Sequence, residues 1–218
     1  MNVHFMCAYY SQYAHKNLAP RTQKQWDAFK FTRAVKSGLI NGYMTVPWKN
    51  KPHEEIDTKN VHRAREIFGS FVRGRISHLG IEDPSIIPVP SKDGLVRAET
   101  YRSAEMVREA MAGSDLEANV ECILRFSKEM ERAAAGGTRD RTALAEGMVL
   151  ISRPRSRAVI LVDDVITTGG SLLAAYDVLS AAAYPPTCAI CCAHTVSDNL
   201  TAAFGHHERE YDPDAGEF

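Results

Sequence analysis

The chain has 218 residues, of which 44% are hydrophobic and 24% charged, and its formal net charge is -1. These values fit a globular protein with one well-packed α/β domain plus an elaboration, and the balanced charge gives no overall attraction to nucleic acid or membrane. No apolar run approaches the roughly 18 residues of a membrane span and the N-terminus lacks a secretory signal pattern, so we expect a cytoplasmic protein.

Hydrophobic periodicity predicts a mixture of short strands and amphipathic helices in the N-terminal part. The expected elements there are a strand at 3–10, a helix at 22–37, a strand within 41–48, a loop at 49–57 and a helix at 58–79. Gly38 stands where it would end the second of these elements as a C-terminal cap.

The rest of the chain alternates strands and helices. The expected elements are a strand at 85–90, a polar turn at 91–94, a helix from 97 to 112, a strand at 120–126, a charged segment at 127–147 that is either a mobile loop or a poorly specified helix, a strand at 158–165, a helix at 171–183 and a strand at 187–195. This alternation predicts an α/β fold with a central parallel sheet flanked by helices, in which 158–165 is central and 85–90 lies beside it. The polar, acidic residues 205–218 suggest a loosely held tail.

The five cysteines show no disulfide framework, so we expect reduced thiols. Cys188, Cys191 and Cys192 fall in an apolar run, where small hydrophobic side chains of a buried strand explain them more simply than a metal or redox site does. A zinc site would need a second pair at similar spacing, which the sequence lacks.

The most informative segment is 159–171, Val-Ile-Leu-Val-Asp-Asp-Val-Ile-Thr-Thr-Gly-Gly-Ser. An apolar strand ends in Asp163 and Asp164, and the turn that follows opens directly into a helix, at the sheet edge where parallel α/β folds bind ligands. The glycines allow an anion to approach the backbone, the hydroxyls add donors, and the helix start contributes free amides and positive potential.

The two aspartates would repel a phosphate, so their natural partners are sugar hydroxyls or the shell of a magnesium ion. One loop thus offers a phosphate site beside a diol site, which describes a ribose 5-phosphate. The simpler alternative is a structural corner with Ser171 as the helix N-cap and the aspartates in solvent, but capping does not require two acids followed by Thr-Thr-Gly-Gly.

This segment resembles the signature of type I phosphoribosyltransferases. The resemblance implies that family's fold, a site for phosphoribosyl diphosphate (PRPP) with Mg²⁺, and a homodimer. It assigns Asp163 and Asp164 as catalytic groups on the ribose hydroxyls, with Asp163 also meeting Mg²⁺ through water or those hydroxyls. It places the 5-phosphate among Thr167, Thr168, Gly169, Gly170 and Ser171.

The resemblance also implies a pyrophosphate loop on an earlier strand, and the segment 86–94 has the right place in the chain. Ser91 and Lys92 are therefore expected pyrophosphate ligands, although Ser-Lys-Asp-Gly alone would be an ordinary turn. Arg125, at the end of the strand predicted at 120–126, is the third expected pyrophosphate ligand. The loop 127–147 corresponds to the mobile loop of the family. Its candidates for reaching the pyrophosphate are Lys128, Arg132, Arg139 and Arg141, for which a solvated connector is the alternative.

Within the family, Pro88-Val89-Pro90 and the residues 101–107 are similar to the ComF-type branch. The chain departs from it in lacking an N-terminal four-cysteine zinc module and in carrying Tyr101-Arg102-Ser103 in place of the usual residues. The expected organisation is a variable hood at 1–57, a phosphoribosyltransferase-like core at 58–204 and the tail at 205–218.

The implied reaction transfers ribose 5-phosphate from PRPP to an unidentified nitrogenous acceptor and releases pyrophosphate. Thr167 stands where enzymes that act on 6-oxopurines typically carry an aspartate, which disfavours hypoxanthine or guanine as the acceptor. Two alternatives stay open. One is a non-catalytic PRPP-binding protein with a regulatory, competence-like or nucleic-acid-linked role, and the other is a PRPP hydrolase or toxin-like enzyme.

Overall fold

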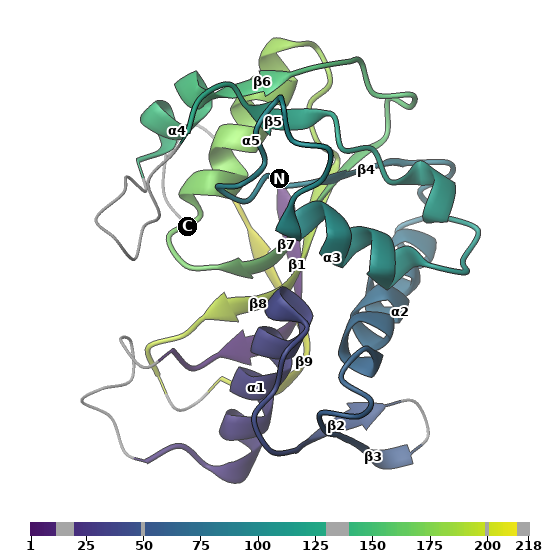
Figure 1. Cartoon of the computed structure of the whole chain (residues 1–218), viewed down its shortest axis with the longest axis vertical. Coiled ribbons are helices and arrows are strands. Elements are labelled where there is room, and N and C mark those ends of the chain that lie inside the picture. Colours follow the sequence, from purple (N-terminus) through teal and green to yellow (C-terminus); the bar gives the residue numbers. More distant parts are fainter. Residues whose placement is uncertain (12–19, 49–50, 130–139, 199–200, 213–218) are drawn as a thin grey trace.

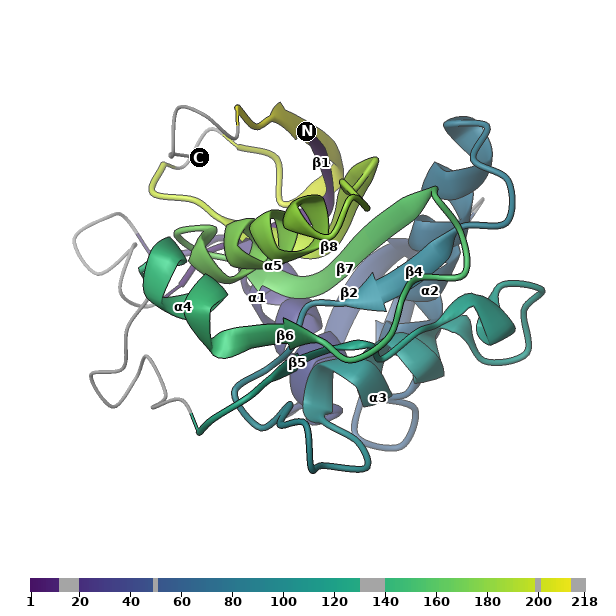
Figure 2. The same cartoon turned by 90° about the horizontal axis from the view of Figure 1, so that it is seen from above.

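The computed structural model describes residues 1–11, 20–48, 51–129, 140–198 and 201–212. A mixed five-stranded sheet forms its centre and helices cover both faces (Figures 1 and 2). Its strands are β1 (Asn2–Tyr9), β4 (Ser85–Pro88), β7 (Val159–Ile166), β8 (Cys188–Thr195) and β9 (Phe204–Glu210). The order is β4-β7-β8-β1-β9; β9 pairs antiparallel with β1, and the other neighbours pair in parallel.

The predicted neighbours β4 and β7 do pair in parallel, with Ser85 opposite Val159. β7 is an interior strand, and β8 occupies the middle of the order. The expectation of an α/β fold with a mainly parallel sheet is therefore confirmed. The buried strand predicted around Cys188, Cys191 and Cys192 is also confirmed as β8, and all five cysteines are free.

The helices form two layers. They are α1 (Gln23–Ser37), α2 (Arg63–His78), α3 (Arg102–Met111), α4 (Arg141–Gly147) and α5 (Gly170–Ala181). Successive strand residues face opposite sides, so Ile160 and Val162 of β7 pack with α1, α2 and α3, whereas Val159 and Leu161 pack with α5 and α4. Among the described residues, no helix has both the length and the apolar character that a membrane crossing requires.

Helix α1 has clear local signals at both ends. Thr22 and Gln25 form a capping box, in which each side chain accepts a hydrogen bond from the backbone amide of the other. Gly38, in the left-handed conformation at φ 68°, ends the helix by donating its amide to the Ala34 carbonyl. These ends agree with the prediction, whereas α2 and α3 each begin five residues later than predicted.

Two small antiparallel sheets lie outside the central one. They are β2 (Met44–Trp48) with β3 (Lys51–Ile56), and β5 (Leu124–Phe126) with β6 (Met148–Leu150). The prediction of a loop at 49–57 was wrong for β3, because a strand of an isolated hairpin tolerates a proline. The strand predicted at 120–126 is shorter than expected and does not join the central sheet, to which Val120 contributes a single bridge with Ile86.

Both ends of the chain enter the central sheet. β1 lies between β8 and β9, so the predicted boundary at residue 57 does not separate an N-terminal hood from the core. The loose tail predicted from residue 205 instead begins with β9, whose backbone pairs with β1 while most of its polar side chains stay exposed. The segment 127–147 was predicted as a mobile loop or a poorly specified helix, and its residues 141–147 form the short helix α4, capped by the Asp140 side chain. The residues 130–139 lie outside the described part.

Candidate active site

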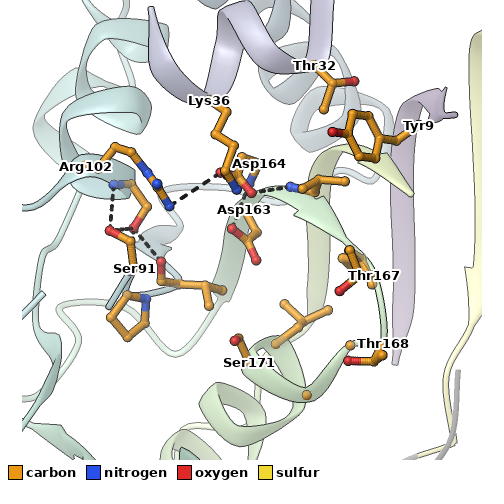
Figure 3. A pocket seen from close by; sticks show the side chains of 18 of the residues that line it. Tyr9, Thr32, Lys36, Ser91, Arg102, Asp163, Asp164, Thr167, Thr168 and Ser171 are labelled. Atoms are coloured by element: carbon orange, nitrogen blue, oxygen red, sulfur yellow. Dashed lines mark hydrogen bonds and ion pairs between the residues drawn. The ribbon is translucent and has the colours of Figure 1, made fainter. Parts of the chain in front are cut away.

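A pocket of about 440 Å³ lies at the carboxyl edge of the sheet (Figure 3). Four parts of the chain build it: the end of β1 with α1, the loop after β4, the start of α3, and the end of β7 with the start of α5. Its lining comprises Tyr9, Thr32, Arg33, Lys36, 89–92, Arg102, Ser103 and 163–172. The structure therefore brings together the predicted ribose, 5-phosphate and Ser91–Lys92 segments.

The turn between β7 and α5 has the geometry of an anion cradle. Gly169 is the N-cap residue of α5 and adopts a left-handed conformation at φ 78°, which favours glycine. No side chain caps the helix, and Gly169, Gly170 and Ser171 line the pocket. The alternative with Ser171 as the N-cap is thus wrong, and the uncapped helix start borders the pocket, where it can receive an anion.

The two aspartates have different surroundings. The Asp164 side chain is buried, and its Oδ2 atom lies 2.6 Å from Nζ of Lys36 and 3.9 Å from Nη2 of Arg102. Asp163 is half-buried, and its Oδ1 atom accepts a hydrogen bond of 2.8 Å from the Asp164 amide. Burial, and then the neighbouring Asp164 carboxylate, raise the pKa of Asp163 to about 7. Asp164 is therefore a paired anion, whereas Asp163 exchanges its proton near neutral pH.

The loop after β4 is fastened to the start of α3. The Ser103 hydroxyl donates to the Val89 carbonyl (2.6 Å) and accepts from the Ser91 amide (3.0 Å). In return, the Ser103 amide donates to the Ser91 hydroxyl (3.2 Å), and the Arg102 amide donates to Asp93 (3.0 Å). These bonds fasten residues 89–93 to the first turn of α3, which begins at Arg102. They also hold Ser91 at the wall of the pocket.

The remaining two predicted pyrophosphate ligands differ in position. Lys92 lines the pocket, but its ammonium is buried 5.5 Å from the centre of the Phe126 ring, without a hydrogen-bond partner among the described residues, and this burial lowers its pKa. Arg125 does not line the pocket. Its buried guanidinium donates to two backbone carbonyls and lies 4.5 Å from the Tyr101 ring. Its position supports packing and gives no support for pyrophosphate binding.

The basic residues of 127–147 give the site no cation within the described part of the chain. Arg141 is held by bonds to both oxygens of Asp177 (2.6 and 2.5 Å) and to the Tyr211 hydroxyl (3.0 Å). Lys128 is exposed and lines a different hollow. Arg132 and Arg139 lie outside the described residues.

Three further cations line the pocket, Arg33, Lys36 and Arg102, and none of them was predicted from the sequence as a site residue. Lys36 and Arg33 belong to the last turns of α1, where they look like ordinary solvated helix charges. Arg102 had only one sequence signal, its position in a segment that departs from the family pattern. The insertion of β1 into the central sheet brings α1 to the pocket, because α1 packs against β1. Tyr9 and Thr32 enter the lining in the same way.

Chemically, the pocket combines an uncapped helix start, hydroxyl groups, a carboxyl that titrates near pH 7, and a buried carboxylate with two cations nearby. Such a set can bind a phosphate and a polyol side by side and can stabilise charge on a leaving group. No family model matches the sequence, and no curated protein matches it.

Proposed function

We propose that the chain is a phosphoribosyltransferase with a type I fold, which binds PRPP with Mg²⁺ and transfers ribose 5-phosphate to a nitrogenous acceptor. The observation that carries this proposal is the junction of β7 and α5, where the left-handed Gly169 opens an uncapped helix start within the same pocket as Asp163 and Asp164. A 5-phosphate suits the helix start and the hydroxyls of the turn. The ribose hydroxyls suit the carboxylates, which accept hydrogen bonds.

The donor set also fits Mg²⁺. Asp163 offers a carboxylate oxygen, the ligand type that this ion prefers, and it forms no ion pair within the described residues that an arriving cation would have to displace. Asp163 would hold the ion through water or through the ribose hydroxyls. When bound, Mg²⁺ supplies neutralising charge for the pyrophosphate group. The protein residues orient the ribose and exclude water from the anomeric carbon.

The two sides of the pocket suggest where the reactants lie. Ser91 and Arg102 lie on one side of the aspartates, and Tyr9 and Thr32 on the other (Figure 3). Displacement at the anomeric carbon places the nucleophile and the leaving group on opposite faces of the ribose. We therefore assign pyrophosphate to the side of Ser91 and Arg102, and the acceptor to the side of Tyr9.

The acceptor side favours a planar, negatively charged ring. Tyr9 stacks on Phe29 with ring centres 5.4 Å apart and planes inclined by 10°, and another flat ring can extend such a stack. Arg33 lines the pocket and forms no ion pair within the described residues, so its guanidinium is available for a carboxylate. Tyr9 belongs to β1 and Arg33 to α1, so the N-terminal part of the chain builds this side of the pocket. We therefore infer that this part of the chain selects the acceptor.

The proposal is tested by measuring pyrophosphate release from PRPP and Mg²⁺ with a panel of nitrogenous rings, both carboxylated and neutral. Acceptor-dependent release supports the transferase. Acceptor-independent release indicates a hydrolase, and calorimetric binding of PRPP without any release indicates a binding protein. The control is the double variant Asp163→Asn with Asp164→Asn, which should keep its fold by circular dichroism and lose PRPP binding. Unchanged affinity in that variant would refute the site.

A further inference from the structure

A second cluster of titratable side chains lies between β1 and β9, which run side by side in the sheet (Figure 1). His4 of β1 is fully buried and directly opposite Glu208 of β9, and His206 lies next to both. Nδ1 of His4 is 3.2 Å from Nε2 of His206 and 3.7 Å from Oε2 of Glu208. Nε2 of His206 and Oε2 of Glu208 are 4.0 Å apart. None of the three residues lines the pocket described above.

These separations suit the ligands of a tetrahedral metal ion. Zinc binds imidazole nitrogen and carboxylate oxygen at about 2.0–2.2 Å, so two ligand atoms in a tetrahedral shell are about 3.3–3.6 Å apart. The observed separations of 3.2, 3.7 and 4.0 Å require the carboxylate oxygen to move closer to the imidazoles by up to about 0.7 Å. We propose that His4, His206 and Glu208 form a zinc site with three protein ligands and a fourth position for water.

The donor atoms suit a metal ion. Nδ1 of His4 and Nε2 of His206 face each other across 3.2 Å, so each imidazole presents one ring nitrogen to the cluster. Glu208 supplies the negative charge. Its other oxygen, Oε1, accepts a hydrogen bond of 3.0 Å from the Asn2 side chain, which holds Oε2 on the side of the imidazoles.

The choice of ion follows from the donors and their spacing. Two imidazoles and one carboxylate disfavour Mg²⁺ and Ca²⁺, which prefer oxygen ligands alone. Separations of 3.2, 3.7 and 4.0 Å are closer to a tetrahedral shell than to the tighter octahedral shell of iron, which favours zinc.

A zinc ion bound by these three residues would link β1 to β9, which are the first and the last strands of the sheet in chain order. Because it binds the folded chain, it should also raise the unfolding temperature. Neither readout depends on the enzymatic activity proposed above, so the zinc site and the transferase can fail independently of each other.

The test is calorimetric titration of Zn²⁺ into the full chain after dialysis against EDTA, with circular dichroism to confirm folding of each variant. We expect saturable binding of one ion, at least about tenfold weaker in His206→Ala and in Glu208→Gln. Glu210→Gln, which removes a carboxylate from the same strand, should bind as the wild type does. Absence of saturable binding, or equal binding by Glu208→Gln and Glu210→Gln, would overturn the proposal.

Discussion

Two adjacent residues at the end of β7 differ in chemistry because a strand turns successive side chains in opposite directions. Asp164 lies among Lys36 and Arg102, so its charge is compensated. Asp163 forms no ion pair within the described residues, and its carboxyl holds a proton up to about pH 7. One carboxylate is thus held in an ion pair, while the other can gain its charge when a cation or ligand arrives.

The raised pKa of Asp163 predicts that the difference in unfolding free energy between Asp163→Asn and the wild type depends on pH. Its pKa rises from 3.8 to about 7 on folding, so its contribution is most favourable below 3.8 and is lost as the pH rises through 7. After a discount for its partial exposure, we expect Asp163→Asn to be more stable than the wild type by roughly 1–3 kcal/mol at pH 8. The difference should shrink toward pH 5. Urea unfolding at both pH values measures it, and a pH-independent difference would contradict the assignment.

We expect Gly169 to be essential for PRPP binding and to contribute moderately to the free energy of unfolding. Valine at its φ of 78° costs about 1–2 kcal/mol and puts a branched side chain where the phosphate would approach. The matched control is Gly113→Val, because Gly113 has a φ of 69° in a turn with open space around it. Both variants should lose similar stability in urea unfolding, and only Gly169→Val should lose PRPP affinity by calorimetry. Wild-type affinity in Gly169→Val would rule out the phosphate cradle.

At the scale of elements, the shape of the candidate active site depends on how one loop is attached to the start of a helix. The loop after β4 is held by the buried Ser103 hydroxyl, which bonds to both Val89 and Ser91. The start of α3 therefore shapes the proposed pyrophosphate side of the pocket. Helix α1 contributes at its other end, because its last turns carry Arg33 and Lys36 to the pocket.

We expect Ser103→Ala to lose about 1–3 kcal/mol of stability, because it leaves the Ser91 amide without its buried partner. The loosened loop should also weaken PRPP binding. Ser114→Ala is the control: its hydroxyl donates to the Met111 carbonyl at 2.6 Å, away from the pocket. Chemical denaturation and calorimetry on both variants decide the matter. Equal PRPP affinity in the two variants would show that Ser103 has a purely structural role.

At the scale of the whole molecule, β1 and β9 pair at one edge of the central sheet, so the N-terminal and C-terminal parts of the chain lie together there. The N-terminal ammonium donates to the Tyr211 carbonyl, and the Tyr211 ring is buried against the α4–α5 side of the core. The Tyr211 hydroxyl accepts a hydrogen bond from Arg141 of α4. The C-terminal segment thus belongs to the core through residue 211, although its composition is that of a loose tail.

Tyr211→Ala should therefore destabilise the protein by about 3–5 kcal/mol, as expected for removal of a buried aromatic ring. Tyr43→Ala is the control, because the Tyr43 ring is 56% exposed and its loss should change stability by less than about 1 kcal/mol. Guanidinium unfolding of the two variants provides the comparison. Similar unfolding midpoints for the two variants would contradict this prediction and would indicate that the C-terminal segment is only loosely held.

The sequence by itself determined the features that consecutive residues encode. The apolar run of β7, the turn 167–169 and the helix after it follow one another directly, and the Thr22 cap and Gly38 stop mark the ends of α1. The candidate ribose and phosphate ligands could therefore be predicted, because neighbours in the chain share one local geometry.

Only the tertiary structure decided which distant segments meet. The ion pair between Lys36 and Asp164 exists because β1 lies beside β8 in the central sheet and carries α1 to the pocket. Arg125 looked like a strand-end ligand, yet packing turned its guanidinium toward backbone carbonyls. Strand order and side-chain direction depend on how the whole chain buries its apolar surface and pairs its backbone. No single window of sequence contains that balance.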